Sequence, residues 1–69
     1  MTKESIFHIL KARDGWRVVL EGAESAFSSF GTLQEAAEAA RKLAIASKPS
    51  RVILHASDGS VQAEKAFKA

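Results

Sequence analysis

The chain has 69 residues, 46% hydrophobic and 26% charged, which excludes an intrinsically disordered protein and limits it to a single domain, residues 1–69. Ten Lys and Arg against eight Asp and Glu give a net charge of +2, without the basic cluster typical of nucleic-acid binders. No apolar run approaches the roughly 20 residues of a membrane span, and no Cys is present for disulfides or thiolate metal sites. We therefore expect a cytoplasmic protein with no cofactor.

The first predicted element is a β-hairpin. Residues 6–13 and 16–21 are rich in β-branched and aromatic side chains and flank the dipeptide Asp14-Gly15. Glycine has no Cβ and aspartate tolerates the left-handed region, so this dipeptide suits the two positive φ values of a type I′ turn.

The loop length decides which side chains of this hairpin face the core. A two-residue Asp14-Gly15 loop places Val18 opposite Lys11, and the inward side chains are then Phe7, Ile9, Trp16, Val18 and Leu20. A three-residue loop with a glycine bulge instead pairs Trp16 with Ala12 and turns the opposite set inward, namely Ile6, His8 and Leu10. We favour the first register.

A short edge strand and one helix follow. Residues 25–30 predict the strand, and Thr32 with Glu35 three residues later has the spacing of a helix capping box. The helix is predicted over residues 33–47, because Pro49 disfavours the helical conformation at the residue before it. Its apolar face consists of Leu33, Ala36, Ala37, Ala40, Leu43 and Ala44.

Residues 51–57 and 60–67 flank Asp58-Gly59 and predict a second hairpin of the same kind. A two-residue loop places Ala56 opposite Val61 and Leu54 opposite Ala63. The face turned away from the helix then carries Arg51, Ile53, His55, Gln62 and Glu64. The predicted fold is α+β, a small antiparallel sheet of four to five strands (β-β-(β)-α-β-β) with one helix packed on one face.

One helix cannot cover both faces of this sheet, and Val19 and Ile53 remain on the outer face in either register. Scattered apolar side chains on a sheet surface are common and need no partner. Alternatively, the outer face or a strand edge forms a homodimer or receives another protein. We therefore expect a binding or self-associating module whose contact residues are Arg17, Val19, Arg51, Ile53 and His55.

Catalytic and metal-binding patterns are missing from the sequence. His8 and His55 are the only histidines, and without Cys they would need carboxylates from unconnected segments to complete a metal site. No serine lies in a nucleophile-elbow motif, and the four glycines are too far apart to form a phosphate loop. We expect no enzyme activity, no bound metal and no membrane association.

Weak nucleic-acid binding is the alternative hypothesis. Arg17 and Arg51 can share the outer face, with Lys65 and Lys68 close in sequence to the last strand. Glu21 and Glu64 lie on the same face and oppose phosphate binding. Trp16 is expected in the core rather than stacked on bases.

Several short strings, taken together, resemble a known family. They are Asp14-Gly15-Trp16-Arg17-Val18, Glu21-Gly22-Ala23, Glu35-Ala36 with Ala39-Ala40-Arg41, and Ile53-Leu54-His55 with Asp58-Gly59. Their order and spacing are similar to those of the small bacterial family known as domain of unknown function 2188, over about residues 6–67. The sequence departs from it in having one glycine before Trp16, where the family often has two, and Phe67, where it often has tyrosine. The resemblance implies a compact bacterial α+β domain and brings no activity or functional residues.

Overall fold

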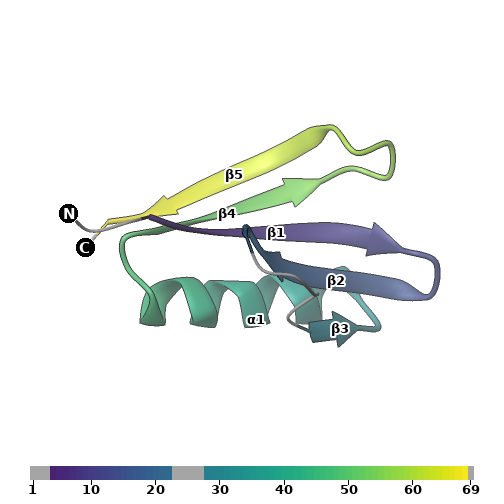
Figure 1. The fold of residues 1–69 in the computed structure, drawn as a ribbon. Helices are drawn as coiled ribbons and strands as arrows, with labels where there is room; N and C mark the ends of the chain where they lie inside the picture. Colours follow the sequence, from purple (N-terminus) through teal and green to yellow (C-terminus); the bar gives the residue numbers. More distant parts are fainter. Residues whose placement is uncertain (1–3, 23–27, 69) are drawn as a thin grey trace.

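The computed structural model describes residues 4–22 and 28–68, which form a five-stranded sheet with one helix on one side (Figure 1). The third strand, optional in the prediction, is present, so the order is β-β-β-α-β-β. The predicted strand residues 25–27 lie outside the described part. In chain order the elements are β1 Ser5–Ala12, β2 Gly15–Leu20, β3 Ser28–Phe30, α1 Leu33–Ala46, β4 Ser50–His55 and β5 Val61–Phe67.

The sheet is mixed, which corrects the predicted antiparallel sheet. Its strand order is β3-β2-β1-β4-β5, and β1 pairs with β4 in parallel, whereas every other pair is antiparallel. The reason is the path of α1, which carries the chain from β3 at one edge to the far side of β1 (Figure 1). A crossover of this kind returns the chain to the end of the sheet at which β1 began, so that β4 runs in the same direction as β1.

The first hairpin has the predicted faces but not the predicted pairing. Lys11 lies opposite Trp16, not Val18, so the pairing predicted from an Asp14-Gly15 loop was wrong by two residues. The turn residues are Arg13 and Asp14. Because a shift of two residues keeps every side chain on its own face, the inward set is the one expected from the favoured register.

The glycine of this hairpin has a different role from the one predicted. No residue other than glycine has a positive φ in the described part of the chain, so Asp14 does not adopt the type I′ conformation. Gly15 has a φ of +152°, and a Cβ at this position would collide with the backbone oxygen of Phe30 in β3. Glycine is therefore required by the close approach of β3 to β2.

The second hairpin also differs from a two-residue turn. The Gly59 amide donates to the Ala56 oxygen at 2.9 Å, and the Ala56 amide donates to the Ser60 oxygen at 2.8 Å. His55, rather than Ala56, therefore lies opposite Val61. A register shift between Leu54 and His55 adds one residue to β5. On the side of this shift away from the turn, the predicted pairing of Leu54 with Ala63 is confirmed.

The helix begins as the capping pattern predicts. The Glu35 amide donates to Thr32 Oγ1 at 3.1 Å. The Glu35 carboxylate accepts from the Thr32 hydroxyl at 3.1 Å, and not from the Thr32 amide as in a complete capping box. The helix ends one residue before the predicted boundary, at Ala46, where the Ser47 amide donates to the Ala44 oxygen.

The core lies between α1 and the three strands β1, β2 and β4. Every fourth residue of the helix is an alanine that is 0% exposed, namely Ala36, Ala40 and Ala44. Their small side chains let the helix approach the sheet closely, so that Phe7, Ile9 and Val18 fill the space between the layers. Ala37, predicted on the same helix face, is exposed and lines a groove together with residues of β4 and β5.

Candidate functional site

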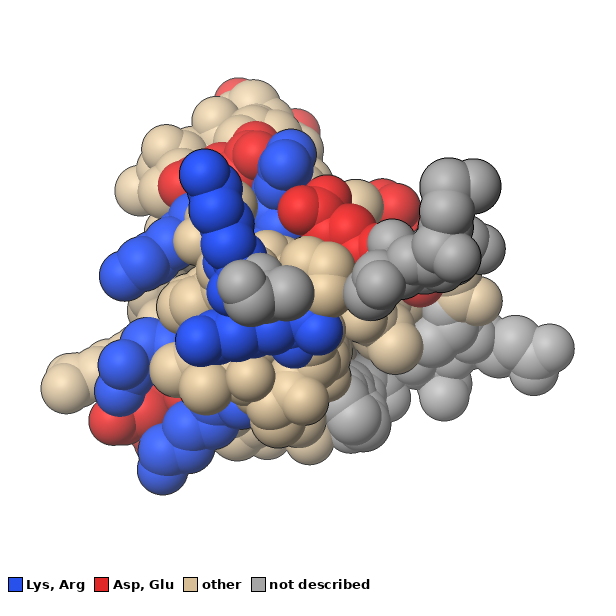
Figure 2. Space-filling view, turned by 90° about the vertical axis from the view of Figure 1, so that its left-hand side faces the viewer, with Lys and Arg blue, Asp and Glu red and all other residues tan. Residues whose placement is uncertain are grey.

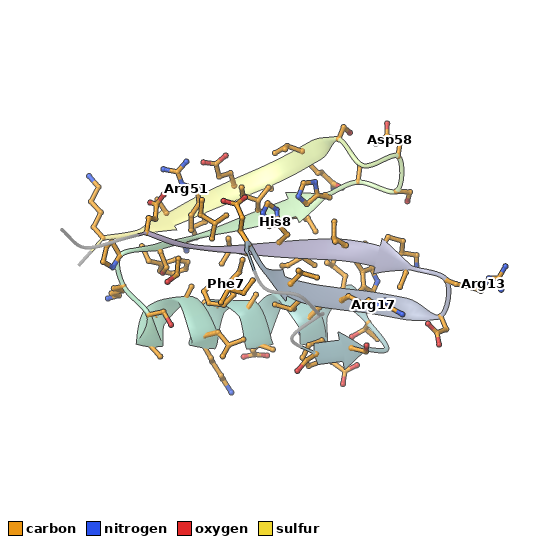
Figure 3. All side chains as sticks on the ribbon, in the orientation of Figure 1. Phe7, His8, Arg13, Arg17, Arg51 and Asp58 are labelled. Carbon is orange, nitrogen blue, oxygen red and sulfur yellow. The ribbon has the colours of Figure 1, made fainter. Side chains whose placement is uncertain are left out.

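The side of the sheet opposite α1, called the open face below, carries all five residues predicted as a contact surface. Arg17 and Val19 come from β2, and Arg51, Ile53 and His55 come from β4, with β1 between the two strands. Figure 3 shows Phe7 pointing between sheet and helix, and Arg51 on the other side of the sheet. The structure therefore places the predicted residues on one continuous surface.

The centre of the open face is apolar with one imidazole in its middle. His8 of β1 lies opposite Val19 on one side and beside Ile53 on the other. Both aliphatic side chains are half-buried, and neither belongs to the core cluster beneath the helix. Within the described residues, α1 packs on the other side of the sheet, so the burial of Val19 and Ile53 comes from their neighbours on this face.

The two arginines of the open face differ in their surroundings. Arg51 forms ion pairs with Glu64 at 2.8 Å and with Glu4 at 3.5 Å. Its Nε atom is buried, without a hydrogen-bond partner among the residues that the structure describes. Arg17 is exposed, and no ion pair to it is found among residues 4–22 and 28–68. Most of the charge of Arg51 is thus compensated, whereas that of Arg17 faces solvent.

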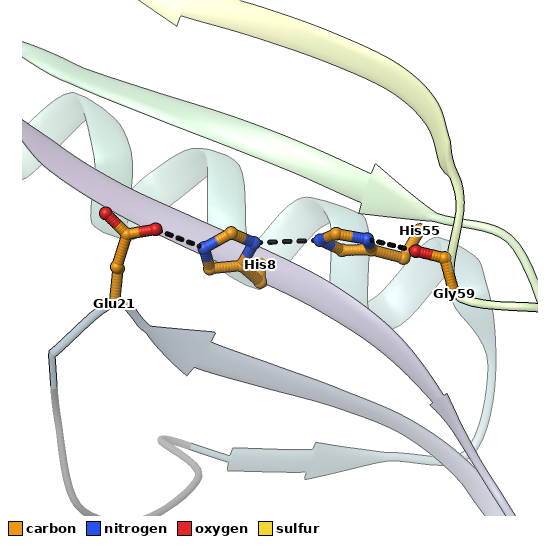
Figure 4. A network of polar contacts seen from close by, with 4 residues as sticks. All are labelled: His8, Glu21, His55 and Gly59. Carbon is orange, nitrogen blue, oxygen red and sulfur yellow. Dashed lines mark hydrogen bonds and ion pairs between the residues drawn. The ribbon is translucent and has the colours of Figure 1, made fainter.

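A chain of four polar groups crosses the open face (Figure 4). His8 Nε2 lies 3.0 Å from Glu21 Oε1, and His8 Nδ1 lies 2.8 Å from His55 Nε2. At the far end, His55 Nδ1 lies 3.1 Å from the backbone oxygen of Gly59. These polar groups connect the residue after β2 with β1, β4 and the turn after β4. The side chain of His8 is 21% exposed, so solvent reaches it.

Charge at one end of the molecule is mixed in sign. Figure 2 views the end of the molecule at which β1 begins and β5 ends, and Lys and Arg side chains there are interspersed with Asp and Glu. A continuous basic surface, which would hold a phosphate backbone, is not seen in this view.

A family model described as an uncharacterized protein conserved in bacteria, domain of unknown function 2188, matches residues 7–67. The chain belongs to this family. It is also 44% identical over 55 residues to the uncharacterized protein YdaT of Bacillus subtilis (strain 168), a match that covers 80% of the chain. The same match spans only 36% of that relative's length. No solved structure matches the chain.

In this member of the family, the pairing of His8 with His55 was missed by sequence reasoning. The two histidines are 47 residues apart, and only the parallel pairing of β1 with β4 brings their strands together. The one signal in the sequence was the register, which places both histidines on the same face. Glu21 was assigned to that face as well, but its bond to His8 was not predicted.

A second apolar surface of this family member lies on the helix side of the sheet and was also missed. A groove of about 250 Å³ runs between α1 and β5, because the helix leaves the helix-side surface of β5 open. Its floor is formed by Val52, Leu54, Ala63 and Phe67, and Arg41 stands at its rim. Val61, farther along β5, is 58% exposed.

A second hollow, of about 300 Å³, lies beside the first hairpin turn and β3. Asp14 and Arg17 line it, without a hydrogen bond or ion pair between them in the described part of the chain. Within the described residues, no three His, Asp or Glu side chains gather in a group able to hold a metal ion. A helix with the length and apolar character needed to cross a membrane is likewise not found among them.

Proposed function

We propose that this chain is a non-catalytic module that binds another protein, or a second copy of itself, through the open face of its sheet. The proposal is carried by the apolar centre of that face, where Val19 and Ile53 flank His8 and α1 packs on the opposite side. Burying these side chains against a partner would remove further apolar surface from water.

A second copy is the occupant tested first, because the open face carries opposite charges on the two sides of Val19. Arg17 and Glu21 are both exposed and lie two residues on either side of Val19. A twofold axis that passes near Val19 and runs across β2, perpendicular to the strand, would therefore place the Arg17 side chain of one copy beside Glu21 of the other. Such a surface is complementary to itself.

Light scattering across a concentration series tests the proposal. We expect the wild-type mass to rise toward that of a dimer, and Val19→Glu and Ile53→Glu to keep the protein monomeric, because each introduces a charge into the apolar centre. Arg17→Glu changes an exposed side chain and should leave the fold intact. It should weaken the dimer, because it would bring two carboxylates together at each contact between position 17 of one copy and Glu21 of the other.

Two further variants serve as controls for an added charge elsewhere. Ile45→Glu alters an exposed apolar residue of α1, which is 43% exposed, and should leave association unchanged. Val61→Glu should also leave it unchanged, whereas loss of the dimer in this variant would assign the contact to the β5 edge.

The proposal fails if the wild type stays monomeric and its open-face amide resonances do not move in cell extract. Salt-dependent shifts of Arg17 and Arg51 on adding short DNA would favour nucleic-acid binding instead.

A further inference from the structure

The two ends of the polar chain on the open face fix the tautomers of both histidines. A backbone oxygen only accepts hydrogen bonds, so the Gly59 oxygen requires a proton on His55 Nδ1. An ionised carboxylate likewise only accepts, so Glu21 requires a proton on His8 Nε2. Both remaining ring nitrogens face each other.

These facing nitrogens, His8 Nδ1 and His55 Nε2, lie 2.8 Å apart. If both rings are neutral, each nitrogen presents a lone pair and no hydrogen atom lies between them. If both rings are positively charged, two N–H groups point at each other. When the two neutral rings together take up one additional proton, it lies between the facing nitrogens and forms an N–H···N hydrogen bond of ordinary length.

We propose that His8 and His55 form a binding site for a single proton, which the two rings share and whose positive charge Glu21 balances. The distance between the nitrogens suits a proton better than a metal ion. Two imidazole nitrogens bound to one tetrahedral zinc, at about 2.0–2.1 Å each, would stand roughly 3.3 Å apart. The described residues also offer no third ligand.

The other charged groups around the site leave Glu21 as the balancing charge. On the strand next to His8, Arg51 is engaged by Glu64 and Glu4, while Arg17 on β2 is exposed to solvent. In the turn after β4, the hydroxyl and amide of Ser60 hold Asp58 ionised by hydrogen bonding. The charges of α1 lie beyond the sheet, on the other face.

The proton changes the charge at the centre of the open face. With one shared proton, the two rings and Glu21 sum to zero, whereas loss of the proton leaves −1 and a second proton gives +1. A consequence for binding rests on the proposed function. If the open face is the contact surface, binding should be strongest over the pH interval in which the two histidine rings hold one shared proton.

Nitrogen-15 NMR of the imidazole rings tests the site directly in the whole chain, in the presence of a metal chelator. Spectra are recorded on the protein made monomeric by dilution, so that failure of the proposed function does not affect them. We expect His8 protonated on Nε2 and His55 on Nδ1. We also expect the pair to take up protons in two macroscopic steps more than about one pH unit apart.

Variants separate a shared proton from two independent histidines. His55→Gln should leave His8 to titrate in one step, and Glu21→Gln should shorten the interval with one bound proton, because the balancing charge is lost. Glu38→Gln makes the same change on the exposed side of α1 and should leave both steps in place. A single step in the wild type, at which both rings protonate together, overturns the proposal, as do the opposite tautomers.

Discussion

The two faces of the sheet are built from alternate residues of the same strands, yet they differ in how they are stabilised. On the face covered by α1, Phe7, Ile9 and Val18 are at most 2% exposed and meet alanines of the helix. On the open face, Val19 and Ile53 are half-buried around a chain of hydrogen-bonded polar groups. The covered face thus supplies most of the stability, while the open face keeps groups that solvent and a partner can reach.

A matched pair of isoleucines gives the largest expected effect. Ile9→Ala removes a side chain that is 2% exposed beneath the helix, and we expect a loss of about 2–5 kcal/mol in the free energy of unfolding. Ile53→Ala makes the same change on the open face and should cost less than half as much, because its site is partly solvated. Urea denaturation of both variants measures the difference. Equal losses would break the contrast between the two faces.

A matched pair of serines gives a smaller effect. Ser50 is 0% exposed, and its hydroxyl donates to the Ala44 oxygen near the end of α1. We expect Ser50→Ala to lower the free energy of unfolding by about 1 kcal/mol, which is the usual net value of such a bond. Ser29→Ala, at an exposed strand position of β3, should lie within about 0.5 kcal/mol of the wild type. A larger loss at Ser29 than at Ser50 would contradict this assignment.

The smallest expected effect concerns the turn that positions the Gly59 oxygen at the end of the open-face chain. Hydrogen bonds from the Ser60 hydroxyl and amide lower the pKa of Asp58 below its ordinary value of 3.8. Because the ionised form is favoured in the folded state, its contribution is complete above that ordinary value and is lost as the pH falls through the lowered pKa.

Asp58→Asn keeps an oxygen acceptor but removes this titration. We therefore expect a small difference in stability between wild type and variant at neutral pH, and a decrease in that difference on acidification below about pH 4. Denaturation curves over a pH series measure it. Asp14→Asn, at the aspartate of the other turn, serves as the control, since the Asp14 side chain makes no hydrogen bond within the described residues. A difference that grows toward acid pH would contradict the assignment.

The sequence predicted the elements and their faces well. Thr32 and Glu35 located the start of the helix, and the alternation of β1, β2 and β4 identified the open face that carries Arg17 and Ile53. Both features depend on residues a few positions apart, whose side chains and backbone interact directly. The hairpin turns were less well predicted, since Gly15 is fixed by its contact with Phe30 rather than by its own turn.

By itself, the sequence determined which segments form hairpins, where the helix is capped and which side chains share a face, because local conformation and the two-residue period of a strand suffice for these. Only the tertiary structure decided that β1 and β4 run in parallel and that β5 extends beyond the helix. The contact of His8 with His55 depends on that parallel pairing. Such contacts join segments distant in sequence, and their geometry follows from how the layers pack rather than from any local pattern.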